Sequence, residues 1–110
     1  MDSSYSRRFS KKASADLDDI IRYIAIELSN PDAASVFIDK LLSVIDEACM
    51  FPQSGTPAAT EVFPDAGIRK KPVGNYVIYY LPDNSNNAVV ILRILYSRRN
   101  LNEILAELTI

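Results

Sequence analysis

The spacing of apolar residues in the first half of the chain predicts two amphipathic helices. In the first, which begins within residues 11–14 and ends near Ser29, the apolar positions share one helical face: Leu17, Ile20, Ile21, Ile24 and Leu28. Ser10 or Ser14 is the candidate N-cap. Asn30 and Pro31 are typical first residues of a second helix, whose apolar face runs from Ala34 to Cys49 and which is predicted to end at Phe51. The short link between them predicts an antiparallel helical hairpin over residues 13–51.

The remaining segments have the patterns of a sheet. Residues 5–10 are predicted as a strand before the helices, and a loop rich in Pro and Gly follows them over residues 52–67. Beyond the loop, β-branched and aromatic runs separated by turn residues predict strands over residues 68–73, 76–81 and 88–96. The last of these is almost wholly apolar, which indicates a central strand. Asn100 and Glu103 have the spacing of a capping box, which predicts a C-terminal helix over residues 100–108.

These elements predict one α+β domain over residues 1–110, with the sheet over residues 68–96. An N-terminal strand and the helical hairpin pack on an antiparallel or mixed sheet of three to four strands, and a short helix ends the chain. Because no other element remains to cover it, the sheet face opposite the helices is expected to be partly open.

Composition excludes several kinds of site. The chain has 110 residues, of which 48% are hydrophobic and 24% charged, as in one globular domain. It has no His and a single Cys, Cys49, which argues against His metal sites, Ser-His triads and a disulfide framework. We therefore expect no cofactor and no metal. No apolar run reaches the roughly 18 residues of a membrane span, and the N-terminus lacks the apolar core of a signal peptide, so we expect a cytoplasmic protein without a membrane partner.

The net charge of −2 conceals two regions of opposite sign. Residues 13–51 carry eight acidic against two basic residues, and residues 66–102 carry six basic residues against Asp83. The overall charge gives no reason to expect nucleic-acid binding, and we expect no direct DNA binding by this chain alone. The basic region leaves a local contact with nucleic acid open.

Arg93 interrupts the apolar strand over residues 88–96. Strand alternation places it on the face of Val89, Ile91 and Leu95. A buried guanidinium without a partner is very costly, so two interpretations remain. Either Arg93 reaches the sheet edge or pairs with an acid, or its face is an exposed cationic binding surface.

Five further cations flank the predicted hairpin of residues 76–96. Arg69, Lys70 and Lys71 precede it, and Arg98 and Arg99 follow it. They are either a solvated edge, or they converge with the neighbouring tyrosine at one end of the sheet. Arg, Lys and Tyr together bind phosphate and stabilise developing negative charge without His or metal.

Other polar candidates have structural interpretations. We interpret the three tyrosines of residues 76–80 as packing residues and Cys49 as a small apolar filler. The acids at positions 16, 18 and 19 are predicted to stabilise the N-terminus of the first helix.

Five segments in order resemble the toxins of the RelE/ParE superfamily, over roughly residues 5–105. They are ADLDDIIRYI (15–24), PDAASVF (31–37), FPQSG (51–55), GIRKKPVGNYVIYY (67–80) and VILRILYSRR (90–99). The resemblance implies the small α/β toxin fold of that superfamily. It also implies the toxin half of a type II toxin–antitoxin module, of the kind linked to plasmid stabilization.

Two motifs favour the ParE-like branch, whose members poison DNA gyrase. Gly67 and Arg69 form the Gly-x-Arg that precedes Val-Gly-Asn-Tyr at residues 73–76, and Leu-Arg-Ile-Leu stands at residues 92–95. The chain departs from that branch at Tyr96, where relatives commonly have His, and at Asn100, where they have an acid.

The RelE-like branch, whose members cleave mRNA on the ribosome, is matched less completely. Lys70 and Arg98 fall near its catalytic cations. Val77 and Ile104, however, stand where a catalytic Arg and a C-terminal Tyr are expected.

The resemblance implies a growth inhibitor that is neutralised by a cognate antitoxin and acts on a protein target such as DNA gyrase. The implied surface for target or antitoxin consists of six cations: Arg69, Lys70, Lys71, Arg93, Arg98 and Arg99. The alternative is a metal-independent mRNA endoribonuclease with the ribosome and mRNA as partners, in which Lys70, Tyr96 and Arg98 are catalytic. A toxin that has lost its activity is a third interpretation.

Overall fold

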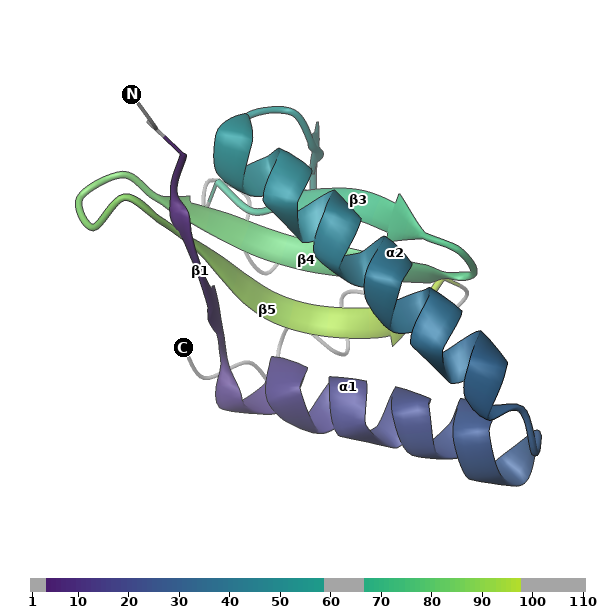
Figure 1. Ribbon diagram of the computed structural model, residues 1–110. Coiled ribbons are helices and arrows are strands. Elements are labelled where there is room, and N and C mark those ends of the chain that lie inside the picture. The colour runs from purple at the N-terminus through teal and green to yellow at the C-terminus, as the bar shows by residue number, and fades with distance from the viewer. Residues whose placement is uncertain (1–3, 59–66, 98–110) are drawn as a thin grey trace.

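The computed structural model describes residues 4–58 and 67–97 of the chain. In chain order the elements are β1 (Ser6–Phe9), α1 (Lys11–Arg22), η1 (Tyr23–Glu27), α2 (Pro31–Met50), β2 (Thr56–Pro57), β3 (Arg69–Val73), β4 (Tyr76–Asp83) and β5 (Ala88–Tyr96). They confirm the predicted α+β class (Figure 1). The predicted helix over residues 100–108 and residues 59–66 of the predicted loop lie outside the described residues.

The strands form one mixed sheet of five strands in the order β1-β5-β4-β3-β2. β1 runs parallel to β5, with Ser6 opposite Ala88, and the other neighbours are antiparallel. β5 therefore lies inside the sheet, as its apolar sequence predicts. The sheet is larger than expected because the N-terminal strand joins it and the two residues of β2 extend its other edge.

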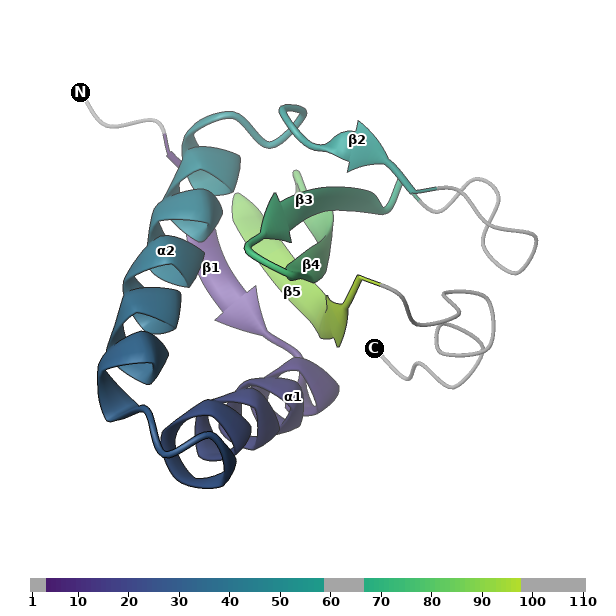
Figure 2. The same ribbon diagram turned by 90° about the vertical axis from the view of Figure 1, so that its right-hand side faces the viewer.

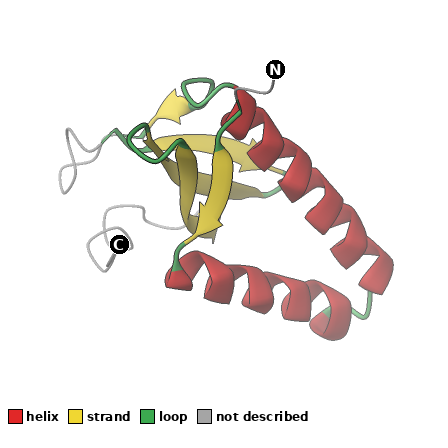
Figure 3. Ribbon diagram, turned by 60° about the vertical axis from the view of Figure 1, so that its left-hand side comes forward, coloured by secondary structure: helices red, strands yellow, loops and turns green. Residues whose placement is uncertain are grey.

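The two helices begin where the sequence predicts. The Ser10 hydroxyl accepts a hydrogen bond from the Ala13 amide at 3.0 Å, and the Asn30 side chain accepts one from the Ala33 amide at 3.1 Å. From their junction the helices diverge, however, as Figures 2 and 3 show. α2 packs against β3 and α1 against β5, and α2 meets the first helix at its last turn, η1. The predicted antiparallel packing of the two helices is therefore confined to their junction, and both apolar faces contribute to one core cluster over the sheet.

The end of the first helix is not a regular α-helix. Its last turn, η1, is π-helical, and the Leu28 amide donates to the Tyr23 carbonyl five residues earlier at 3.0 Å. This wider turn rotates the following residues off the predicted apolar face. Leu28, expected to be buried, is 55% exposed.

Apolar side chains pack on both faces of the sheet. The face toward the helices holds the larger cluster, which includes Phe37, Leu41, Ile45, Ile78 and Tyr80. The opposite face holds a second buried cluster: Ala58, Ile68, Tyr79, Leu92 and Leu95. The expectation of an open face is therefore wrong at these positions. Ala58, directly after β2, and Ile68, directly before β3, contribute apolar side chains to this face.

A β-bulge changes the alternation of β5. Tyr80 lies opposite Ile91 and Tyr79 opposite Arg93, so Leu92 is an extra residue on β5. Arg93 therefore lies opposite a member of the second cluster. The prediction that it shares a face with Val89 and Ile91 is wrong, since both pack in the helix-facing cluster.

Candidate functional site

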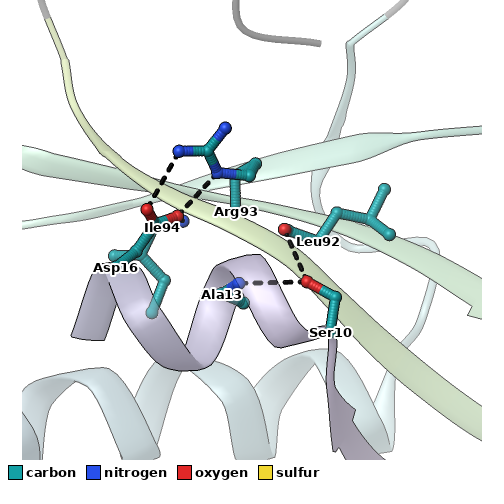
Figure 4. Close-up of polar contacts among 6 residues, drawn as sticks. All are labelled: Ser10, Ala13, Asp16, Leu92, Arg93 and Ile94. Carbon is teal, nitrogen blue, oxygen red and sulfur yellow. Dashed lines mark hydrogen bonds and ion pairs between the residues drawn. The ribbon is translucent and has the colours of Figure 1, made fainter. Parts of the chain in front are cut away.

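Arg93 is buried and paired with an acid from α1 (Figure 4). Its Nε donates to Asp16 Oδ2 at 2.7 Å and its Nη2 donates to Asp16 Oδ1 at 2.9 Å. The two side chains are 10% and 15% exposed. Of the two interpretations of Arg93, the geometry supports pairing with an acid and contradicts an exposed binding surface.

Asp16 belongs to a set of contacts by which α1 covers the edge of β5. β1 ends opposite Ile91, so on that side the next residues of β5 have no partner strand among the described residues, while β4 pairs with them on the other side. The Ser10 hydroxyl donates to the Leu92 carbonyl at 2.8 Å, and Asp16 accepts from the Ile94 amide at 3.0 Å. These side chains satisfy backbone groups that another strand would otherwise pair. Asp16 does not serve the helix N-terminus as predicted, because α1 begins five residues earlier at Lys11.

Two of the three cations of β3 hold structural positions. Arg69 donates to the Gly55 carbonyl, and the buried Lys71 forms an ion pair with Glu47 of α2. Lys70 between them is exposed. Since β3 alternates between the two sheet faces, Lys71 points toward the helices and Lys70 points away from them.

The register separates Lys70 from Tyr96. Lys70 lies opposite Tyr79, which packs on the face away from the helices. Tyr96 lies opposite Tyr76, which packs against the helix-facing cluster, and Tyr76 lies opposite Val73. Lys70 and Val73 are three residues apart, or about 10 Å along β3. Of the two interpretations of these cations, the register contradicts the convergence of Arg69 and Lys70 with Tyr96, and the predicted site residues Arg98 and Arg99 lie outside the described residues.

A cationic pocket that sequence reasoning missed lies where β1 meets α1. Its volume is about 570 Å³, and its lining includes Arg8, Lys11 and Lys12 beside the apolar Phe9 and Val90. Arg8 is on β1, an outer strand of the sheet, and lies opposite Val90 of β5. The sequence signal for this pocket is the group of four cations within residues 7–12. These residues lie outside the acidic region 13–51 and the basic region 66–102.

Asp83 is the acid in this cationic pocket. Hydrogen bonds from Asn86, together with the charge of Arg8, hold the pKa of Asp83 below its usual value. Asp83 therefore stays ionised, beside a lining that carries the cations Arg8, Lys11 and Lys12.

A second pocket, of about 400 Å³, is lined by the tyrosines Tyr23, Tyr76 and Tyr96. The ring centroids of Tyr76 and Tyr96 are 5.8 Å apart, with 76° between the ring planes. Phe37 packs edge-on against Tyr76, with a distance of 5.3 Å between the ring centroids. Burial, with Tyr23 and Tyr96 close by, raises the pKa of Tyr76, so its hydroxyl stays protonated near neutral pH. Tyr76 packs against the core as predicted, and it also lines this surface pocket.

The described residues offer little for covalent or metal chemistry. Cys49 is buried on α2, and burial together with Asp46 raises its pKa, which disfavours the nucleophilic thiolate. Within residues 4–58 and 67–97, no three His, Cys, Asp or Glu side chains are grouped so that they could hold a metal ion. Nor does that part of the chain contain a helix long and apolar enough to span a membrane.

Known proteins resemble the chain in sequence pattern and in fold. The profile of the family described as "ParE toxin of type II toxin-antitoxin system, parDE" matches residues 7–101. A chain of the chromosomal ParDE toxin–antitoxin system from P. aeruginosa superposes with a TM-score of 0.66 at 21% identity, covering 86% of this chain and 98% of that one. A chain of the toxin–antitoxin complex RelBE2 from Mycobacterium tuberculosis superposes with a TM-score of 0.58 at 22% identity, covering 84% and 98%. No curated protein matches significantly in sequence.

Proposed function

Because the chain belongs to the family of ParE toxins of type II toxin–antitoxin systems, we propose that it inhibits growth by binding a protein target such as DNA gyrase. We propose further that a cognate antitoxin neutralises it. The resemblance of its Gly-x-Arg and Leu-Arg-Ile-Leu motifs to the gyrase-directed branch supports this choice of target.

The observation that carries the proposal is the placement of the candidate catalytic residues. Lys70 and Tyr96 lie on opposite faces of the sheet. A catalytic acid and a catalytic base must both come within hydrogen-bond distance of the reacting groups of one bound substrate. Lys71 and Arg93 are held in ion pairs with the helices. This arrangement favours a protein that acts by binding over an endoribonuclease.

The cationic pocket is the surface we assign to the antitoxin. Its lining combines the cations Arg8, Lys11 and Lys12 with the apolar Phe9 and Val90. An acidic amphipathic segment matches such a surface in both charge and hydrophobicity, and segments of this kind often fold on binding. The antitoxin segment therefore places acidic side chains beside the cations and an apolar side chain beside Phe9 and Val90.

Induced expression tests the proposal in cells. We expect induction to stop division, with filamentous cells and damaged DNA, while protein synthesis continues. Co-expression of the small protein encoded beside this gene is expected to restore growth and to co-purify with the toxin. Immediate arrest of translation with cleaved mRNA would instead support the ribonuclease, and failure to recover any protein partner would contradict the antitoxin.

A further inference from the structure

The tyrosine pocket has the geometry of an aromatic cage. The ring planes of Tyr76 and Tyr96 are 76° apart, so the two rings meet at a corner, and Tyr23 is a third aromatic residue in the lining. Tyr23 and Tyr96 remain 49% and 45% exposed, so the fold leaves much of both rings uncovered. Cages of this kind bind cations, because the electron-rich faces of the rings attract positive charge.

The helical wall of the pocket is the irregular part of α1. Tyr23 is the first residue of the π-helical turn η1. Such turns are rare and are found disproportionately at functional sites, because they re-aim side chains at some cost to helix stability. The turn therefore gives a reason, independent of the pocket, to expect a function at this end of the molecule.

The charge near this end of the helices favours a cationic occupant. Glu27 ends the same π-helical turn, and Asp18 and Asp32 lie on the adjoining parts of α1 and α2. Within the described part of the chain, none of these three acids forms an ion pair. Their negative charge attracts a basic side chain and repels an acidic segment of the kind assigned to the antitoxin.

We propose that the tyrosine pocket receives an arginine side chain of the target protein. The planar guanidinium stacks on an exposed ring face and donates hydrogen bonds in its plane, which an ammonium group does less well. The inference rests on the proposed function in that it takes the target to be a protein. It adds a second contact site, separate from the cationic pocket. It also names the chemical group that this site recognises.

A titration of the purified toxin tests the cage without any knowledge of the target. N-acetyl-arginine amide is added while the ring signals of the tyrosines are followed by NMR, with N-acetyl-citrulline amide as the neutral analogue of the same shape. We expect saturable shifts of Tyr23, Tyr76 and Tyr96 with the arginine compound, and binding of the citrulline compound at least about fivefold weaker. Equal binding of the two compounds, or no saturable shift, would overturn the proposal.

A pair of substitutions tests the role of the pocket in cells. Tyr96→Leu keeps apolar bulk without the aromatic face and is expected to be at least about fivefold less potent than Tyr96→Phe, which keeps that face. Phe51→Leu is the control, since Phe51 is an exposed aromatic residue at the other end of α2. Both Tyr96 variants are expected to co-purify with the antitoxin as the wild type does.

The outcomes separate this inference from the proposed function. A Tyr96→Leu variant as toxic as the Tyr96→Phe variant would overturn the assignment of the pocket to the target. A wild-type chain that neither inhibits growth nor recovers an antitoxin would refute the proposed function, and the arginine titration would then still decide whether the cage exists.

Discussion

Two buried cations, Arg93 and Lys71, hold the helices on the sheet. Arg93 of β5 meets Asp16 of α1, and Lys71 of β3 meets Glu47 of α2. The sequence shows that a charge inside an apolar strand needs a partner. It does not identify that partner, because Asp16 is 77 positions away and becomes a neighbour only when α1 lies along β5. The chemistry of the contact was therefore predictable and its geometry was not.

Replacing Asp16 by Ala is expected to lower the free energy of unfolding by about 3 kcal/mol. The change leaves the Arg93 guanidinium without this carboxylate and the Ile94 amide without its acceptor. Urea denaturation measures the effect. The control is Asp39→Ala, an exposed acid on α2 for which we expect a change within about 0.5 kcal/mol. Equal stability of the two variants would contradict a stabilising role for the buried pair.

Tyr79 is expected to make stability depend on pH in the alkaline range. Burial raises the pKa of Tyr79 above its ordinary value of about 10. The unfolded chain then loses this phenolic proton at a lower pH than the folded chain, so the contribution is fully present below about pH 10 and is lost as the pH rises toward the folded pKa. In denaturation series from about pH 9 to 11.5, the wild type should lose stability more steeply than Tyr79→Phe. Parallel curves would show that Tyr79 titrates normally in the folded protein.

At the scale of elements, local sequence signals predicted most helices and strands, and long-range pairing decided the remainder. The caps at Ser10 and Asn30 and the strand over residues 88–96 follow from nearby residues. The parallel partner of β1, the two-residue β2 and the bulge at Leu92 depend on which segments meet in space. No local spacing distinguishes the π-helical turn from an α-helix, which is why Leu28 was placed on the wrong side.

The segment between α2 and β2 depends on a close approach of Gly55 to β4. A Cβ at Gly55 would lie 2.5 Å from the Tyr80 hydroxyl and 2.8 Å from the Lys70 carbonyl. The Tyr80 hydroxyl also accepts from the Gly55 amide at 2.9 Å and donates to the Pro52 carbonyl at 3.0 Å. A side chain at Gly55 would therefore displace backbone and break these hydrogen bonds together.

We expect Gly55→Ala to lower the free energy of unfolding by about 2 kcal/mol or more. The control is Gly74→Ala, where the added Cβ meets nothing within 4 Å and only the φ of +60° opposes it. That backbone strain costs about 1 kcal/mol. Thermal denaturation compares the two variants, and a smaller loss at Gly55 than at Gly74 would refute the close approach.

For the molecule as a whole, the two pockets lie toward opposite ends of α1, one with a cationic lining and the other with a neutral aromatic lining. The cationic pocket includes Lys11 at the start of the helix, and the tyrosine pocket includes Tyr23 directly after its end. Twelve residues of α-helix separate them by about 18 Å. Under the two assignments that we propose, an acidic antitoxin segment and a basic target segment have separate primary contacts. The sequence predicted a binding surface of cations on β3 and β5 together with Arg98 and Arg99, which lie outside the described residues, because charges can be counted in a sequence without showing which are buried.

Reversing two charges of the cationic pocket is expected to weaken antitoxin binding. In Arg8→Glu combined with Lys11→Glu, we expect a loss of at least about tenfold in affinity, mainly through a slower association that depends on salt. The fold should tolerate the change, because both residues are exposed and a Glu at the start of α1 suits the helix dipole. Lys40→Glu on α2 is the matched control. Unchanged affinity of the double variant would place the antitoxin elsewhere.

The most direct test of the account is a parallel assay of two activities with purified toxin. One reaction follows DNA supercoiling by gyrase and the other follows cleavage of ribosome-bound mRNA. The wild type and the variant Lys70→Ala with Tyr96→Phe are compared in both. We predict that both proteins inhibit supercoiling to a similar extent and leave the mRNA intact. Cleavage of ribosome-bound mRNA by the wild type, abolished in the variant, would contradict the account, because steep loss at these two positions is the behaviour of catalytic residues.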